Sequence, residues 1–197
     1  MEKILEYVID ESTDEGVFAV SLVEYPAIKS DFVALSAEEV KFADIDREKR
    51  IVMGAALIPN KLIYRESPEG EPFYMYFSED TVRKTSELYF KKSKHGNATI
   101  EHAFGVGGIT AVEAWIVDNP EMDKSKHYGL IVPKGTWMLS MKIDNDQVWD
   151  EYVKSGRVKG FSIEGTFSKA VELKEVEEEM SKEDAIQALR DFFSSLS

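Results

Sequence analysis

Alternating apolar and polar positions run through most of the chain and predict short β-strands. Between residues 158 and 167, Phe161 and Ile163 point to one face of such a strand and Ser162 to the other, because successive side chains alternate. Similar runs, separated by glycine, proline and asparagine turn signals, predict about eight to ten strands in all. The runs cover residues 3–10, 17–23, 49–58, 73–77, 98–103, 109–117 and 136–143, with shorter candidates at 32–36, 39–43 and 63–65.

Three segments have the spacing of helices. Ser78 is placed to cap a helix that runs to about Lys92, and Asn145 is placed to cap one that runs to about Ser155. Residues 181–197 have the pattern of an amphipathic helix. Its apolar side carries Ile186, Leu189, Phe193 and Leu196.

Short and mostly consecutive strands with few helices favour an α+β fold. We expect a small, mostly antiparallel β-barrel flanked by helices, occupying residues 1–170. Five glutamates fall between Glu172 and Glu179, so residues 171–180 are interpreted as an acidic linker that precedes the terminal helix at 181–197.

The composition excludes several classes of site and partner. The 197 residues contain no cysteine, so disulfides, thiolate metal sites and cysteine catalysis are excluded. The net charge of −13 opposes binding to phosphate backbones, so no nucleic-acid partner is expected. No apolar run approaches the ~20 residues that cross a bilayer, and the charged N-terminus is unlike a signal peptide. We therefore expect a cytoplasmic protein without a membrane partner.

Ser162 is the candidate nucleophile, because it places one small hydroxyl on a stiff strand between Gly160 and Gly165. Serine is a weak nucleophile and needs an adjacent base. Of the three histidines, His95 and His127 lie in polar loops, whereas His102 ends a predicted strand and precedes a glycine-rich turn. A single histidine on a strand is more often structural than catalytic, yet His102 is the candidate base that this chain offers.

A carboxylate that orients the base would complete the site. Glu113 is the first candidate, since it interrupts an apolar strand where an acid must be paired if it is buried. If the strands at 98–103 and 109–117 form a hairpin through Gly105–Gly108, Glu113 lies beside His102. A salt bridge to a neighbouring lysine or arginine would explain Glu113 equally well. Asp118 and Glu164 are the alternatives.

Neither a cofactor nor a metal site is predicted. The glycines at 105–108 lack the spacing of a phosphate loop and open no helix. The histidines at 95, 102 and 127 contain no HExxH-like pair, which makes a metal hydrolase a weak alternative.

Several of these segments resemble the XkdF-type phage serine proteases, a group similar to the prohead proteases of tailed phages and, more remotely, to herpesvirus assemblin. The resemblance covers roughly residues 15–170, and its most specific part is Gly160–Gly165 (Gly-Phe-Ser-Ile-Glu-Gly). It implies a β-barrel ringed by helices, with His102 as the base, Glu113 as the acid and Ser162 as the nucleophile. The other matching segments are Gly54–Arg65, Glu101-His102, Val112–Val117 and Gly135–Trp137.

The resemblance also implies a function, namely a serine endopeptidase of capsid maturation. Its expected partners are the scaffold and capsid proteins of a phage or prophage, inside the immature capsid in the bacterial host cytoplasm. Related phage enzymes cut after glutamate in a hydrophobic-x-Glu pattern, which Leu173-Lys174-Glu175 matches. We therefore expect autocleavage near Glu175, which would release residues 176–197.

A second interpretation belongs to a different class. A non-catalytic capsid-assembly or scaffold-binding protein could keep the same fold, and the acidic surface and the amphipathic terminal segment suit such a role equally well. A homo-oligomer is compatible with either interpretation.

Overall fold

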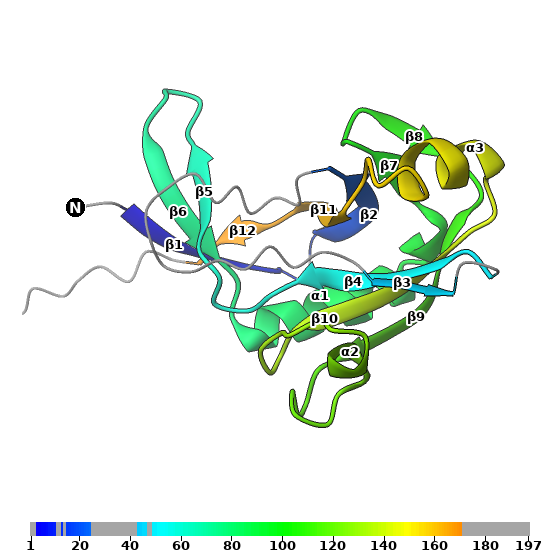
Figure 1. Cartoon of the computed structure of the whole chain (residues 1–197). Helices are drawn as coiled ribbons and strands as arrows, with labels where there is room; N and C mark the ends of the chain where they lie inside the picture. Colours follow the sequence, from blue (N-terminus) through cyan, green and yellow to red (C-terminus); the bar gives the residue numbers. More distant parts are fainter. Residues whose placement is uncertain (1–2, 11–12, 14, 25–42, 47–48, 171–197) are drawn as a thin grey trace, which may run out of the picture.

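The computed structural model describes residues 3–10, 13, 15–24, 43–46 and 49–170, which form three four-stranded sheets (Figure 1). The strands are β1 (Lys3–Val8), β2 (Gly16–Val23), β3 (Ala43–Asp46), β4 (Ile51–Leu57), β5 (Ile63–Glu66), β6 (Pro72–Tyr76), β7 (Ala98–Ile100), β8 (Phe104–Val106), β9 (Ile109–Ile116), β10 (Trp137–Ile143), β11 (Gly160–Thr166) and β12 (Ser168–Lys169). The helical elements are α1 (Glu79–Lys91), α2 (Lys124–His127) and α3 (Asp146–Val148), with a 3-10 turn at Lys94–Gly96 and a π-helical turn at Trp149–Val153.

Each sheet joins strands that are far apart in the sequence. The orders are β12-β1-β6-β5, β3-β4-β10-β9 and β11-β2-β7-β8. Most neighbours are antiparallel, but β1 pairs with β6 and β2 pairs with β7 in parallel. The third sheet, which carries the candidate site, is therefore built from three separate parts of the chain.

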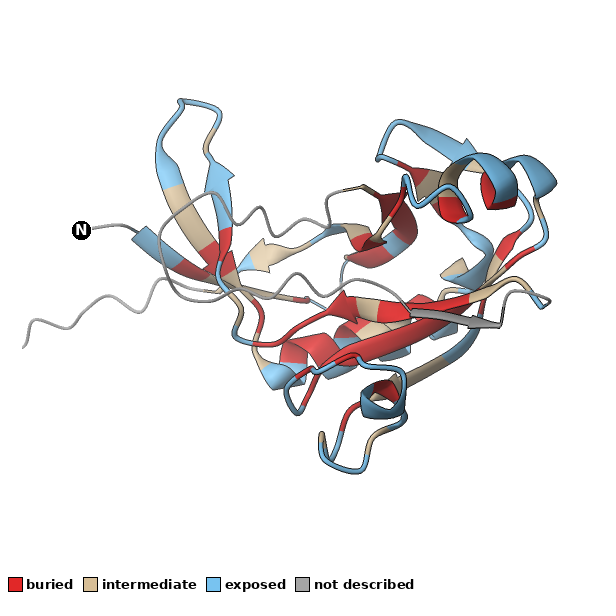
Figure 2. Ribbon diagram, in the orientation of Figure 1, coloured by how far each residue is buried: buried red, intermediate tan, exposed pale blue. Residues whose placement is uncertain are grey.

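The hydrophobic core fills the space between the sheets and α1. Buried residues are concentrated along β2, β4 and β10 (Figure 2). The helix α1 packs against β2 and β10 and buries Val82 and Tyr89, whose ring lies 5.3 Å from that of Trp137. Acidic residues in its first turn and Lys91 in its last turn match the helix dipole.

The predicted helices at 78–92 and 146–155 are confirmed, the second as α3 followed by the π-helical turn. The Asn145 side chain accepts a hydrogen bond from the Val148 amide at 3.0 Å, as expected of a cap. The predicted linker at 171–180 and helix at 181–197 lie outside the described residues. No helix among the described residues has the length and apolar character to cross a membrane.

The prediction of an α+β fold built on a closed β-barrel flanked by helices is wrong, because the described residues are mostly strand with few helices and no closed barrel. Within the part of the chain that the structure describes, the strands form three separate sheets, and none of them closes on itself. The short, mostly consecutive strands that favour a barrel do not all pair in chain order. Instead β1 pairs with β6 and β12, while β2 pairs with β7 and β11. Local alternation sets which face of a strand is buried but not which strand becomes its neighbour.

Candidate active site

Three hydroxyl side chains lie in one row across the sheet β11-β2-β7-β8. Ser162 on β11 is the register partner of Ser21 on β2, and Ser21 is the register partner of Thr99 on β7. Directly paired residues project to the same face of a sheet, so these three residues, here called the hydroxyl row, share one face. Phe161 and Ile163 point to the opposite face, toward the core.

Close packing explains why residue 165, the last of the Gly160–Gly165 segment, is a glycine. A β-carbon on Gly165 would lie 2.7 Å from the Gly16 carbonyl oxygen, closer than a side chain tolerates. The register of β11 against β2 shifts between Glu164 and Gly165, as in a β-bulge. Gly165 thus allows β11 to approach β2 closely just beyond Ser162 and Glu164.

His102 lies in the tight turn between β7 and β8, two residues beyond the end of β7, and not within a strand that runs to residue 103 as predicted. Both Glu101 and His102 adopt left-handed backbone, with φ of 50° and 55°. Such a conformation costs about 1–2 kcal/mol for a residue that has a β-carbon, and it persists only where the surroundings hold it. The His102 amide donates to the Ser21 hydroxyl at 3.0 Å, and the Glu101 carboxylate accepts from the Glu24 amide at 2.6 Å.

The imidazole of His102 contacts the carboxylate of Glu164, which lies on β11 of the same sheet. His102 Nδ1 lies 3.1 Å from Glu164 Oε1, and the Thr99 hydroxyl donates to the same oxygen. The side chain of Glu164 is 20% exposed and that of His102 is 41% exposed. A carboxylate at Nδ1 favours the tautomer with the proton on that nitrogen, which leaves Nε2 available as a base.

Ser162 is a buried residue, and its hydroxyl has no hydrogen-bond partner among the described residues. The residue is 4% exposed, and no hydrogen bond joins it to His102 within that part of the chain. Catalytic hydrogen bonds are often long or unformed before substrate binds. The structure therefore brings Ser162 and the His102–Glu164 pair to one sheet face without a direct bond between serine and histidine.

Glu113 does not lie near His102 but on β9, in the sheet β3-β4-β10-β9. The expected hairpin between 98–103 and 109–117 is wrong, because β7 pairs with β8 while β9 pairs with β10. On β9, Glu113 accepts hydrogen bonds from Lys124 and, at 2.7 Å, from Ser140. These two bonds, that of Lys124 first, hold the pKa of Glu113 below its ordinary value despite partial burial. The contacts match the salt-bridge interpretation, and the carboxylate beside His102 is Glu164.

The remaining candidates contribute to surface or packing contacts. Asp118 is 91% exposed and lies 3.7 Å from the Lys134 ammonium. His95 stacks on Phe90, and His127 meets the edge of the Tyr128 ring. The described residues contain no group of three histidine or acidic side chains that could bind a metal ion.

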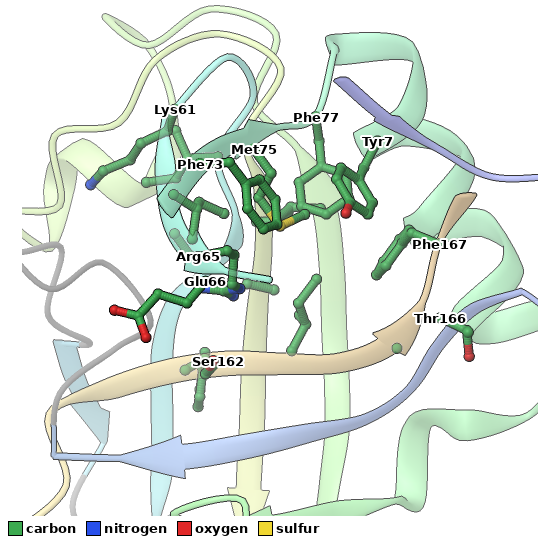
Figure 3. Close-up of a pocket in the computed structure, with 18 residues that line it drawn as sticks. Tyr7, Lys61, Arg65, Glu66, Phe73, Met75, Phe77, Ser162, Thr166 and Phe167 are labelled. Carbon is green, nitrogen blue, oxygen red and sulfur yellow. The ribbon is translucent and has the colours of Figure 1, made fainter. Parts of the chain in front are cut away.

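A cavity of about 390 Å³ lies on the other side of β11, between that strand and the sheet that contains β1, β5 and β6. Figure 3 shows Ser162 on the strand that forms one wall, with Tyr7, Phe73 and Phe77 opposite and Arg65 between them and that strand. The cavity thus borders the backbone of the serine strand, while the hydroxyl row lies on the opposite face.

The sequence matches the model of one known protein family. Residues 39–172 match the family model described as "Putative phage serine protease XkdF". The chain belongs to this family. The resemblance predicted from the Gly160–Gly165 segment is thereby confirmed, and at family level the protein is a phage serine protease. No curated protein and no solved structure gives a significant match.

The span that matches this phage protease family does not contain the whole site. It includes His102, Glu164, Thr99 and Ser162, but Ser21 precedes it. Reasoning from the sequence missed both Thr99 and Ser21. The one available signal was the polar Ser21 inside the apolar run Val17–Val23, which is a position where a buried hydroxyl needs a partner.

Proposed function

We propose that this protein is a serine endopeptidase that processes scaffold and capsid proteins during phage capsid maturation. The observation that carries the proposal is the His102–Glu164 pair on the same sheet face as Ser162. Membership of a phage serine protease family supports the same reaction class. The proposed substrates follow from the resemblance to capsid maturation proteases.

In the proposed mechanism, Ser162 Oγ attacks the carbonyl carbon of a peptide bond while His102 Nε2 takes the hydroxyl proton. The tetrahedral intermediate collapses to an acyl-enzyme, and the proton passes from His102 to the leaving amine. Water then attacks the ester through the same base and releases Ser162. Glu164 keeps the imidazole oriented through Nδ1 and stabilises its charged form.

We assign the orienting role to Glu164 in preference to Glu113. Glu164 lies 3.1 Å from the His102 ring, whereas the carboxylate of Glu113 is engaged by Lys124 and Ser140 in another sheet. An acid that neutralises a lysine cannot at the same time hold a distant imidazole. The original expectation for Glu113 stays a prediction that substitution can test.

The competing function is a non-catalytic capsid-assembly or scaffold-binding protein. Its support is the state of Ser162, which is 4% exposed and has no hydrogen bond to His102 within the described residues. Under the protease proposal, the serine becomes accessible and approaches His102 when substrate binds. Under the alternative, substituting Ser162 leaves every property of the complex with scaffold unchanged.

The test is incubation of the wild type and Ser162→Ala with the cognate scaffold protein, followed by intact mass spectrometry. We expect discrete scaffold fragments with the wild type and none with the variant. The same spectra report cleavage after Glu175, which lies outside the described residues. Identical scaffold masses with both proteins, under conditions where capsids mature, would overturn the proposal.

A further inference from the structure

We propose that Ser21 and Thr99, the two other members of the hydroxyl row, are positioning residues for the His102–Glu164 pair. The inference rests on the proposed protease function and deepens it. Neither residue touches the reacting atoms in the mechanism above. Each holds one half of the pair, Thr99 by its bond to the carboxylate and Ser21 by its bond to the histidine backbone.

Thr99 fixes the carboxylate. Its hydroxyl donates to Glu164 Oε1, the same oxygen that contacts His102 Nδ1. A carboxylate on a side chain with several rotatable bonds can turn away from an imidazole unless a second donor holds it. Because Thr99 is β-branched and lies on a strand, its hydroxyl has few alternative positions. It therefore restricts where Glu164 can present Oε1.

Ser21 fixes the turn. It is fully buried in β2, and its hydroxyl accepts the His102 amide hydrogen at 3.0 Å. That amide belongs to the second of two consecutive left-handed residues, Glu101 and His102, whose conformation needs external support. An alanine at this position would leave the His102 amide without its acceptor, which weakens the conformation that directs the ring toward Glu164.

The row thus joins the proposed nucleophile to both supports of the proposed base. Ser162, Ser21 and Thr99 are successive register partners on three adjacent strands, so a small shift of one strand is transmitted to the others. Misplacement of a catalytic group by about 1 Å can cost roughly 10²-fold in rate. Loss of either support is therefore expected to slow the reaction without removing a reacting group.

The experiment uses the full-length protein and two readouts. The first is the rate at which a fluorophosphonate labels Ser162, a step in which the Oγ–phosphorus bond forms, fluoride leaves and His102 takes the proton. The second is the downfield proton resonance of an imidazole Nδ1–H held by a carboxylate, assigned by its loss in Glu164→Gln. This second readout needs no protease activity.

Thr99→Val keeps the shape of the side chain and removes the donor. We expect labelling to slow roughly 10-fold to 100-fold and the Nδ1–H resonance to broaden or disappear, while Thr99→Ser restores both. Ser21→Ala is expected to act in the same direction. Thr110→Val is the matched control, since Thr110 is a half-buried strand threonine on β9, in another sheet. It should change neither readout.

Wild-type labelling rate and an unchanged resonance in Thr99→Val would overturn the positioning role. Restoration by Thr99→Ser separates that role from a packing effect, which the smaller side chain would not rescue. If the wild type labels no faster than Ser162→Ala, the protease proposal itself fails. In that case the resonance alone decides the positioning role, so the two failures are distinguishable.

Discussion

Among the described residues, Glu113 and Glu164 each lie close to a strand serine, but of the two only Glu164 also contacts a histidine. In the sheet β3-β4-β10-β9, Glu113 is the register partner of Ser140 and is bound by Lys124. In the sheet β11-β2-β7-β8, Glu164 lies two residues from Ser162 and contacts His102. The difference is the third group, because a lysine ammonium only neutralises a carboxylate, whereas an imidazole oriented by a carboxylate can accept a proton at its other ring nitrogen.

The two serines differ in their hydrogen bonding. Ser140 donates its hydrogen bond to Glu113 at 2.7 Å and is part of a closed polar cluster. Ser162 Oγ has no hydrogen-bond partner among the described residues. A serine that makes no structural hydrogen bond is not explained by stability in the way that Ser140 is. The comparison therefore separates a stabilising cluster from a candidate reactive one.

The largest expected effect is on activity, from substituting each carboxylate by its amide. Glu164→Gln should lower kcat by roughly 10²-fold to 10⁴-fold, since an amide cannot stabilise the imidazolium and favours the wrong tautomer. Glu113→Gln should leave kcat within about twofold, as expected for a residue outside the reacting unit. Initial rates of scaffold cleavage measure both. A large loss in Glu113→Gln, with Glu164→Gln near wild type, would restore Glu113 as the orienting acid.

The next effect is on stability, from removing each serine hydroxyl. Ser140→Ala should lower the free energy of unfolding by about 1–2 kcal/mol, because a buried hydrogen bond to a charged group is lost. Ser162→Ala should change it by less than about 0.5 kcal/mol, since no partner is left unpaired. Urea unfolding of the two variants at one pH provides the comparison. Equal destabilisation by both would mean that Ser162 has a structural bond in solution.

The smallest effect is the pH dependence of the Glu113 cluster. The pKa of Glu113 in the folded protein lies below its ordinary value of 4.5, so the carboxylate stabilises the fold above that pH and loses this contribution as the pH falls through the folded pKa. Glu113 is 44% exposed, so its pairing with Lys124 is worth at most about 1 kcal/mol.

The difference in unfolding free energy between the wild type and Glu113→Gln should therefore be small near neutral pH and vanish in acid. Unfolding by urea at about pH 7 and about pH 3 measures it, with Glu121→Gln as control because Glu121 has a more exposed lysine partner. A difference that grows as the pH falls would contradict the assigned sign.

Most strands could be predicted from the sequence, and Ser162 and His102 could be chosen as candidates, because alternation and residue chemistry are local properties. The carboxylate that lies beside His102 could not be singled out from the sequence, because strand pairing is not local. The glycines at 105–108 suggested one hairpin turn, but Phe104–Val106 forms a strand of its own beside β7. The Gly108 carbonyl then accepts hydrogen bonds from the amides of Asp144 and Asn145, which starts β9 alongside β10.

The non-local nature of strand pairing also explains why the predicted barrel is wrong. Alternation over residues 3–10 and 17–23 is correct as a description of two strands, and their burial follows it in part. Their partners are set by side chains far along the chain, which a single sequence does not reveal. Glu164 is an alternative that the sequence offers, but the turn that brings His102 beside it depends on pairing between distant strands.

The central strand of the site lies outside the segment by which the family is recognised. A fragment trimmed to residues 39–172 would lack β2, and β11 and β7 would then have no strand between them. Such a fragment would retain Ser162, His102 and Glu164 in its sequence and yet lose the surface on which they meet. Domain boundaries for recombinant production should therefore follow the sheet and not the matched segment, beginning no later than the first residue of β2.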